Sequence, residues 1–324
     1  MKKFKPVLIC LTWLCLGAQS LYAQQGIASK YPGDAGIGSD PAVIMSENFE
    51  TGTVSDVLAR WTNTGGQGTY SFVSSPPPGS SGTRAFSIYC PNDNSNCYLY
   101  NMLPQGYQQV YLRYYIKYLS GINPHHVGGW MGGYNPPTTY PQGGAGNRPS
   151  GSDRFTIGAE PVDYSTLRFD FYTYWMGMGC LSDPGGCWGN TFIQDPNLIA
   201  PTDRWICVEV MVKMNNPVTS STGELAMWID GKQIIHLGPG YPNVDMINGI
   251  WTPDPNGTGS NYIGPFPGFQ WRNDPSLALN FVWFQNYGTG TILLDNIVLA
   301  KSYVGPLAVG GTTPPAPPTN LRVQ

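Results

Sequence analysis

The sequence is poor in charge and in histidine. Of 324 residues only 11% are charged, with 17 Lys and Arg against 20 Asp and Glu, and there are three histidines. An acidic chain with few basic groups is unsuited to a polyanion, so nucleic acid is excluded as a general partner. An acidic polysaccharide would have to be bound by a local group of arginines.

Long apolar runs are missing after the first 23 residues. The apolar run 6–18 follows Lys2, Lys3 and Lys5 and leads to small residues, which predicts a secretory signal peptide at residues 1–23. This run is shorter than the roughly 20 residues that a membrane-spanning helix needs, and no later run approaches that length. We expect a secreted protein, periplasmic or extracellular, that has no membrane span and acts as a monomer.

A helical repeat is missing as well, because no segment after the signal keeps a 3.6-residue apolar stripe for three turns. Apolar and polar residues alternate instead, in short runs separated by turn-rich segments, and 20 Tyr, 12 Phe and 10 Trp can supply a core despite 41 Gly and 30 Pro. This pattern predicts an all-β fold, a two-sheet antiparallel β-sandwich of the jelly-roll type. We place this domain at residues 25–306 and interpret the Pro-rich residues 307–324 as a linker or tail.

Four of the seven cysteines fall into two loops of equal length, Cys90 to Cys97 and Cys180 to Cys187. Each pair encloses six turn-forming residues, and an exported chain meets an oxidising environment, so two local disulfides are predicted. Zinc is the alternative, but the spacing differs from that of paired Cys-x-x-Cys knuckles. Cys207 lies in an alternating run and is expected to be a buried free thiol.

Polar and aromatic residues share one face of three expected strands, since side chains two apart in a strand point the same way. If these strands are neighbours, they build a groove that suits sugars, because rings cover C–H patches while charged groups bond hydroxyls. The alternative is a solvated outer face. The three strands are expected at residues 111–118, 153–160 and 166–175. The residues of this face are Tyr111, Arg113, Tyr115, Lys117, Arg154, Thr156, Glu160, Arg168, Asp170, Tyr172 and Tyr174.

The stretch "NPHHVGGWMGGYNPP", residues 123–137, holds two of the three histidines. An imidazole with a pKa near ~6.5 can exchange protons at neutral pH. Because neighbouring residues of an extended chain point to opposite sides, we expect only one of His125 and His126 to face the groove. Trp130 and Tyr134 could wall the groove, or their rings could pack inward under a sheet edge.

The segments "ENFETG", "YLRYYIKY", "DFYTYWMGM", "GELAMWIDGKQIIHLGPG" and "LDNIVLAKSYVGP" resemble a group of uncharacterised secreted bacterial proteins. That group is similar to the concanavalin A-like jelly-roll polysaccharide lyases that cleave alginate and glucuronan. The resemblance implies a concave sheet that binds a uronate polymer and cleaves it by β-elimination, which needs a carboxylate-binding group, a base and an acid. The residue types available are Arg154 or Arg168 for the carboxylate, His125 or His126 as base, and Tyr172 or Tyr174 as acid.

Other functions stay open. A glycoside hydrolase needs two carboxylates across a groove, which Glu160, Asp170 and Glu209 could supply, but the chain has no E-x-D-x-E motif. We expect Glu209 instead to form a buried ion pair with an arginine. A non-catalytic carbohydrate-binding module is the second hypothesis, in which Glu47 and Asp295 could hold a structural Ca²⁺. No other cofactor is expected, and a surface protein with protein partners is the third hypothesis.

Overall fold

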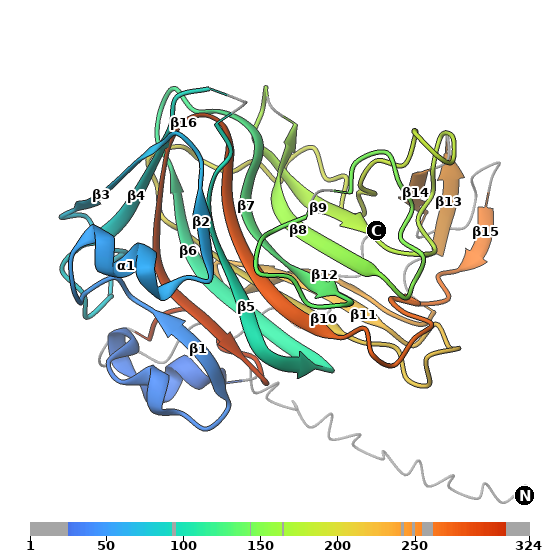
Figure 1. The fold of residues 1–324 in the computed structure, drawn as a ribbon, viewed down its shortest axis with the longest axis horizontal. Helices are drawn as coiled ribbons and strands as arrows, with labels where there is room; N and C mark the ends of the chain where they lie inside the picture. Colours follow the sequence, from blue (N-terminus) through green and yellow to red (C-terminus); the bar gives the residue numbers. More distant parts are fainter. Residues whose placement is uncertain are drawn as a thin grey trace, which may run out of the picture.

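The computed structural model describes residues 25–92, 95–142, 144–163, 165–240, 243–247, 250–254 and 262–308. The predicted signal peptide and residues 309–324 of the predicted tail lie outside these ranges. The described chain confirms the predicted β-sandwich, because two curved antiparallel sheets pack against each other (Figure 1). None of its helices has the length and apolar character needed to cross a membrane.

The sheet that carries the concave face is called the cleft sheet here, and the other the back sheet. The cleft sheet contains, in spatial order, β2 (Asn63–Gly65), β5 (Cys97–Tyr107), the first half of β16 (Leu279–Ala300), β7 (Asn123–Tyr134), β8 (Arg154–Asp163) and β9 (Arg168–Tyr174). The back sheet contains β12 (Lys232–Leu237), β11 (Glu224–Ile229), β10 (Ile206–Lys213), β6 (Gln109–Tyr118), the second half of β16, β4 (Ala85–Cys90) and β3 (Thr69–Val73).

Smaller elements surround the sandwich. They are the 3-10 turns Ile27–Lys30, Pro32–Asp34 and Ile37–Ser39, strand β1 (Val43–Glu47) beside the end of β16, helix α1 (Val54–Arg60), and a separate sheet of β13 (Asn243–Ile247), β14 (Ile250–Pro253) and β15 (Tyr262–Pro265). Helix α1 begins with a capping box, in which Thr53 and Asp56 bond each other's backbone N–H groups.

Strand β16 belongs to both sheets. Residues 281–286 pair with β5 and β7, whereas residues 292–294 pair with β4 and β6. Between these parts the strand bends at Gly290, whose φ of 116° excludes most other residues. A Cβ atom at Gly288 would lie 2.6 Å from the carbonyl oxygen of Asn123, so this position also requires glycine. One continuous strand thereby joins the two sheets.

The core lies between the sheets and confirms the predicted alternation. Phe155, Ile157 and Ala159 of β8 are buried in the same cluster as Leu112 and Ile116 of β6. Each fully buried large apolar side chain stabilises the fold by about 1.5–3 kcal/mol. The opposite faces of the same strands carry the polar residues that we expected there.

Strand β6, however, lies in the back sheet, so its outer face does not line the predicted groove. Arg113 is completely buried, where its guanidinium donates to Asp34 Oδ2 at 2.6 Å and to the carbonyl oxygen of Asn296 at 2.7 Å. The hydroxyl of Tyr115 accepts the N–H of Leu307 at 2.9 Å. The prediction that Arg113 and Tyr115 bind substrate is therefore wrong, because alternation gives the face of a strand but not its sheet.

The C-terminal segment packs on this same outer face. Glu209 accepts the N–H groups of Val304 at 2.7 Å and Gly305 at 2.8 Å, and not an arginine as predicted. Burial raises the pKa of Glu209 to about 7, although the two N–H donors and the nearby Arg113 oppose the shift. Leu307 and Ala308, which we placed in the tail, are buried against the domain.

The cysteines pair as predicted. Cys90 at the end of β4 forms a disulfide with Cys97 at the start of β5, and Cys180 forms one with Cys187. Cys207 is a buried free thiol on β10. The alternative of a zinc site is excluded for these four cysteines, because their sulfur atoms are bonded to each other.

Replacing Arg113 by methionine tests how much the buried Arg113–Asp34 ion pair contributes to the stability of the fold. The variant leaves Asp34 buried without its cation, which should lower the free energy of unfolding by about 3–5 kcal/mol in urea titrations. Arg204→Met is the matched control, because the Arg204–Asp230 pair is 57% and 40% exposed and should contribute at most about 1 kcal/mol. Equal losses in the two variants would contradict this account.

Candidate functional site

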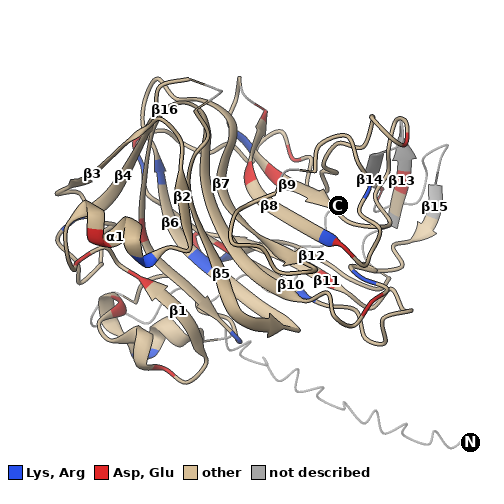
Figure 2. Cartoon of the chain, viewed as in Figure 1, with Lys and Arg blue, Asp and Glu red and all other residues tan. Residues whose placement is uncertain are grey.

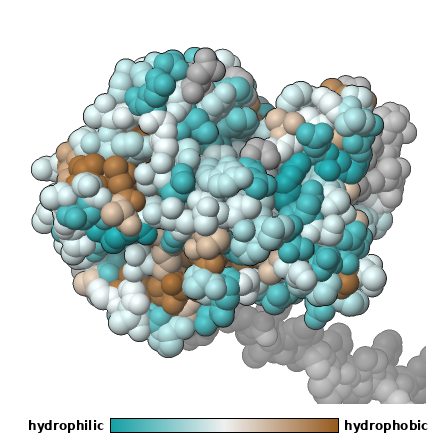
Figure 3. Space-filling view, in the orientation of Figure 1, coloured by the Kyte–Doolittle hydropathy of each residue, from teal (hydrophilic) through white to brown (hydrophobic). Residues whose placement is uncertain are grey.

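A cleft of about 380 Å³ lies on the concave face of the cleft sheet. In the views of Figures 2 and 3, charged residues are sparse on β5 and β7, and the centre of this face is white to pale teal. The cleft is lined mainly by aromatic rings and amides. Its principal side chains are His125, His126 and Trp130 of β7, Tyr172 and Tyr174 of β9, Trp283, Gln285 and Tyr287 of β16, and Gln142 and Trp188 of two loops.

The centre of the site is a histidine bound to a buried carboxylate. His126 Nδ1 lies 2.7 Å from Glu160 Oε1, and Trp130 Nε1 donates to Glu160 Oε2 at 2.8 Å. Glu160 of β8 is 0% exposed, whereas the His126 side chain is 21% exposed. Burial lowers the pKa of His126, but the charge and hydrogen bond of Glu160 outweigh it and the net shift is upward.

His125 also lines the cleft, so the expectation that only one histidine faces it is wrong. Tyr287 pairs with His126 and Gly288 pairs with Pro124, which leaves His125 as an extra residue in β7. Such a β-bulge interrupts the alternation of side chains. The two imidazole rings are stacked with centroids 4.7 Å apart, and His125 also contacts Tyr287 at 5.0 Å.

Tyr172 lies against the other side of His126. The ring centroids are 4.7 Å apart, and the hydroxyl of Tyr174 lies 3.5 Å from that of Tyr172. Burial raises the pKa of both tyrosines, so both are neutral phenols at physiological pH. A neutral phenol can therefore act as general acid while the neighbouring imidazole acts as general base.

The two arginines predicted for carboxylate binding are engaged elsewhere. Arg154 Nη2 donates to the carbonyl oxygens of Gly144 at 3.3 Å and Asn147 at 2.9 Å, behind the loop that borders the cleft. Arg168 Nη1 lies 3.2 Å from Asp170 Oδ2, and neither arginine is among the residues that line the cleft. Their predicted role in binding a uronate is not supported by this placement.

Asp170 is structural, contrary to the prediction that it binds substrate. It is fully buried and accepts the N–H groups of Phe171, Phe192, Ile193 and Gln194, which fixes the segment after residue 191 against β9. Burial raises its pKa, and these backbone donors oppose the shift.

Tyr134 is buried and stacks on Phe281 with ring centroids 4.6 Å apart. Its hydroxyl both donates to the carbonyl and accepts the N–H of Gln142 at 3.0 Å. The ring is thus buried under this loop, in the same aromatic cluster as Trp130, which lines the cleft. Tyr134 holds the loop that carries Gln142.

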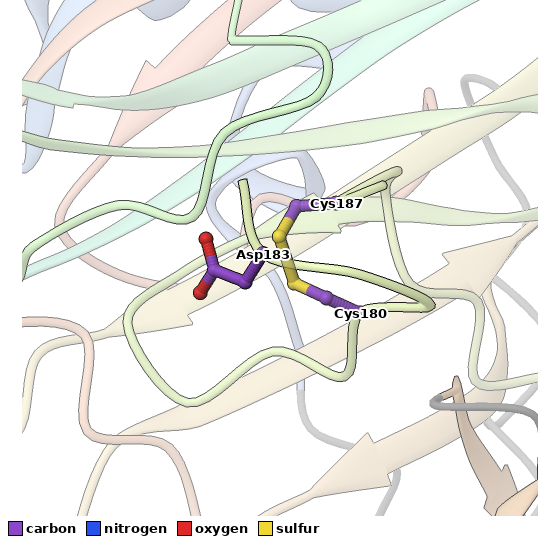
Figure 4. Close-up of side chains that lie close together, drawn as sticks. All are labelled: Cys180, Asp183 and Cys187. Carbon is purple, nitrogen blue, oxygen red and sulfur yellow. A yellow bond between two sulfur atoms is a disulfide. The ribbon is translucent and has the colours of Figure 1, made fainter. Parts of the chain in front are cut away.

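Two connected loops form one rim of the cleft. Gly146 pairs with Cys187, and Arg148 Nε donates to Asp183 Oδ2 at 2.7 Å. Figure 4 shows the Cys180–Cys187 disulfide with Asp183 beside it. This trio is the one group of metal-ligand type within the described ranges, and its disulfide and ion pair leave it unsuited to a metal ion. The disulfide holds Trp188, which is 49% exposed, at the rim.

Both residues predicted for Ca²⁺ accept hydrogen bonds within the protein. Both Glu47 oxygens are bound by Arg60, and Oε1 also accepts the N–H of Phe49. Asp295 is buried, Oδ1 accepts the N–H of Asn296, and burial raises its pKa to about 8. Oδ2 of Asp295, however, is buried without a hydrogen-bond partner, and a structural Ca²⁺ stays a prediction.

Sequence reasoning missed most of the contribution of β16. Trp283, Gln285 and Tyr287 alternate in the run "FVWFQNY", so their common face was readable. The sequence did not show, however, that β16 lies beside β7, which carries the two histidines. Glu160 was placed on the polar face of its strand and considered as a hydrolase carboxylate, but nothing in the sequence pairs it with His126.

No family model matches the sequence, and no curated protein matches it. Among solved structures the chain resembles alginate lyase Aly36B, with a TM-score of 0.51 and 14% identity over 81% of this chain and 98% of that one. It also resembles the cellulose-induced protein Cip1 (TM-score 0.47, 18% identity, 81% and 99%) and alginate lyase vAL-1 from Chlorella virus (0.45, 17%, 80% and 100%). The expected resemblance to jelly-roll lyases is thus confirmed for the fold.

Replacing Glu160 by glutamine should lower the pKa of His126, because burial then acts without the opposing carboxylate. We expect the wild-type pKa above the ordinary value of about 6.5 and the variant pKa below it. Histidine ring resonances report both values by NMR titration, and only three histidines need to be assigned. An unchanged His126 titration would show that Glu160 does not set its pKa.

Proposed function

We propose that this exported protein binds a polysaccharide across its concave sheet and cleaves a uronate-containing polymer by β-elimination. The observation that carries the proposal is the His126–Glu160 pair, at 2.7 Å, inside an aromatic cleft and in contact with a neutral tyrosine. Aromatic walls suit sugar rings, whose C–H faces pack on them. The two disulfides are consistent with export.

In the proposed mechanism His126 is the base. Glu160 holds the proton on Nδ1, which leaves the lone pair on Nε2 to accept the proton from C5 of the uronate. Tyr172 donates its hydroxyl proton to the glycosidic oxygen as the C4–O bond breaks. Glu160 is a positioning residue here, because it fixes the tautomer and the ring orientation of His126 without contacting the sugar.

Hydrolysis by two carboxylates is disfavoured. Neither Asp nor Glu is among the described residues that line the cleft. Glu160 has both oxygens bonded and no exposed surface, and Asp170 is bound by backbone N–H groups. Glu209 lies on the outer face of the back sheet, where it binds the C-terminal segment.

A non-catalytic carbohydrate-binding module is the second candidate. It is favoured by the number of rings in the cleft, since Trp130 and Trp283 lie 5.5 Å apart and Trp188 extends the aromatic surface to the rim. Such a module would need the rings but not the histidine. Substitutions of the two kinds of residue therefore separate the candidates.

Lyase activity is tested by the ultraviolet absorbance of unsaturated products formed from alginate, glucuronan, polygalacturonate and their esters. His126→Ala and Tyr172→Phe should each lower kcat by about 10²–10⁴-fold, because each removes a proton-transfer group. His236→Ala is the histidine control, since His236 is 46% exposed on β12 and bonds Glu224. A wild-type rate in His126→Ala would refute its assignment as the base.

Binding without cleavage would support the module. In that case Trp283→Ala should abolish retention on a polysaccharide gel, with a loss of about 1–3 kcal/mol in binding free energy for one buried ring. His126→Ala should retain it. If the Trp283 variant is retained like the wild type, the polymer does not bind in this cleft.

A further inference from the structure

Among the residues that the structure describes, those that line the cleft include no lysine, arginine, aspartate or glutamate. We propose that the polymer bound here carries its uronate carboxyl groups as neutral esters and not as free carboxylates. This inference rests on the proposed function, because it names the substrate class of the same site. It follows from what surrounds the cleft and from the chemistry of β-elimination.

The nearby guanidinium groups are not among the described residues that line the cleft. Arg154 donates to two carbonyl oxygens of the rim loop, and a side chain at Gly144 would collide with it, so this loop covers it closely. Arg168 is paired with Asp170, and Arg148 is paired with Asp183. Arg168 and Arg148 are thus paired with carboxylates, whereas Arg154 is held behind the loop by neutral acceptors and keeps Nη1 buried without a hydrogen bond.

A negative charge lies directly beneath two residues of the cleft. Glu160 lies under His126 and Trp130, fully buried, where a carboxylate acts through a low dielectric. The whole chain is also acidic, with a formal net charge of −3. A free carboxylate that enters the cleft would be repelled by this charge, and no described lining residue offers a fixed cation. A protonated His126 could supply the positive charge, but it could then no longer act as the base.

An ester removes this conflict. It carries no charge, and its alkyl group can pack against rings such as Trp130, Trp283 and Tyr172. An ester also acidifies the neighbouring C5 proton far more than a carboxylate does. A cation is thus unnecessary, and an uncharged donor such as the amide of Gln285 suffices for the developing charge on the ester carbonyl.

The step balances without a further reactant. His126 Nε2 accepts the C5 proton, the released electron pair forms the C4–C5 double bond, and the C4–O bond breaks. The leaving oxygen takes the proton of Tyr172, which is restored from the imidazolium through solvent. The ester bond stays intact, so each cleavage yields one unsaturated ester end and one new hydroxyl end.

The test compares the ester and the free acid of two polymers. The first pair is highly methyl-esterified polygalacturonate and the same batch after saponification. The second pair is the propylene glycol ester of alginate and alginate itself. Initial rates are read from the product absorbance at neutral pH, and binding is read from retardation in affinity gels. We expect a preference of at least about tenfold for an ester in both readings, because a buried charge acts through a low dielectric and a tenfold ratio corresponds to only about 1.4 kcal/mol.

The outcomes separate the two proposals. Equal or better cleavage of the free acids overturns the ester preference and leaves the lyase in place. Retention of an ester without cleavage overturns the lyase and leaves the preference for an uncharged polymer. Failure to bind or cleave any of the four polymers overturns the ester preference for these backbones together with the lyase.

A charge introduced into the cleft provides a second reading. Thr156 of β8 lines the cleft, and Thr156→Lys adds the cation that it lacks, whereas Thr156→Met adds comparable bulk without charge. The lysine variant should bind the saponified polymers better than the methionine variant, by about tenfold at low salt, and should lose this gain at high salt. Identical binding of the free acids by the two variants would contradict the inference.

Discussion

The continuity of β16 is the constraint on which the rest of the structure depends. One strand pairs with β5 and β7 at its start and with β4 and β6 after the bend at Gly288 and Gly290. Both sheets are thus fixed to each other by the backbone and not only by side-chain packing. The bend lies beside the bulge at His125, because β7 must follow the changing direction of its partner. The position of the histidine pair is a consequence of how the sandwich closes.

The second determinant is the burial of polar groups in satisfied networks. Three buried carboxylates accept hydrogen bonds from neighbouring donors, and each fixes a different part of the chain. They belong to Glu160, Asp170 and Glu209. Glu160 orients a cleft histidine, Asp170 holds the segment after residue 191, and Glu209 holds the C-terminal segment. A buried carboxylate without such donors would destabilise the fold, so these networks specify where each segment lies.

The cleft combines rigid walls with little charge. Its rings come from strands β7, β9 and β16, whereas Trp188 is held at the rim by the Cys180–Cys187 loop. Tyr134 and Arg154 support the connected loop of the same rim through its carbonyl oxygens. The sequence suggested Tyr134 and Arg154 as ligands of the sugar, but both support the loop that borders the cleft.

The sequence by itself determined the class of fold, the faces of the strands and the two disulfides. Alternation places Phe155 and Ile157 on one side of β8 and Glu160 on the other, and this follows from backbone geometry alone. The spacing of Cys90 and Cys97 permits a local bridge in the same way. What only the tertiary structure decided is which strands are neighbours: that β6 belongs to the back sheet, that β16 lies beside β7, and that Glu160 meets His126. These contacts join residues far apart in the chain, and the bulge at His125 arises from such pairing, so no local pattern encodes them.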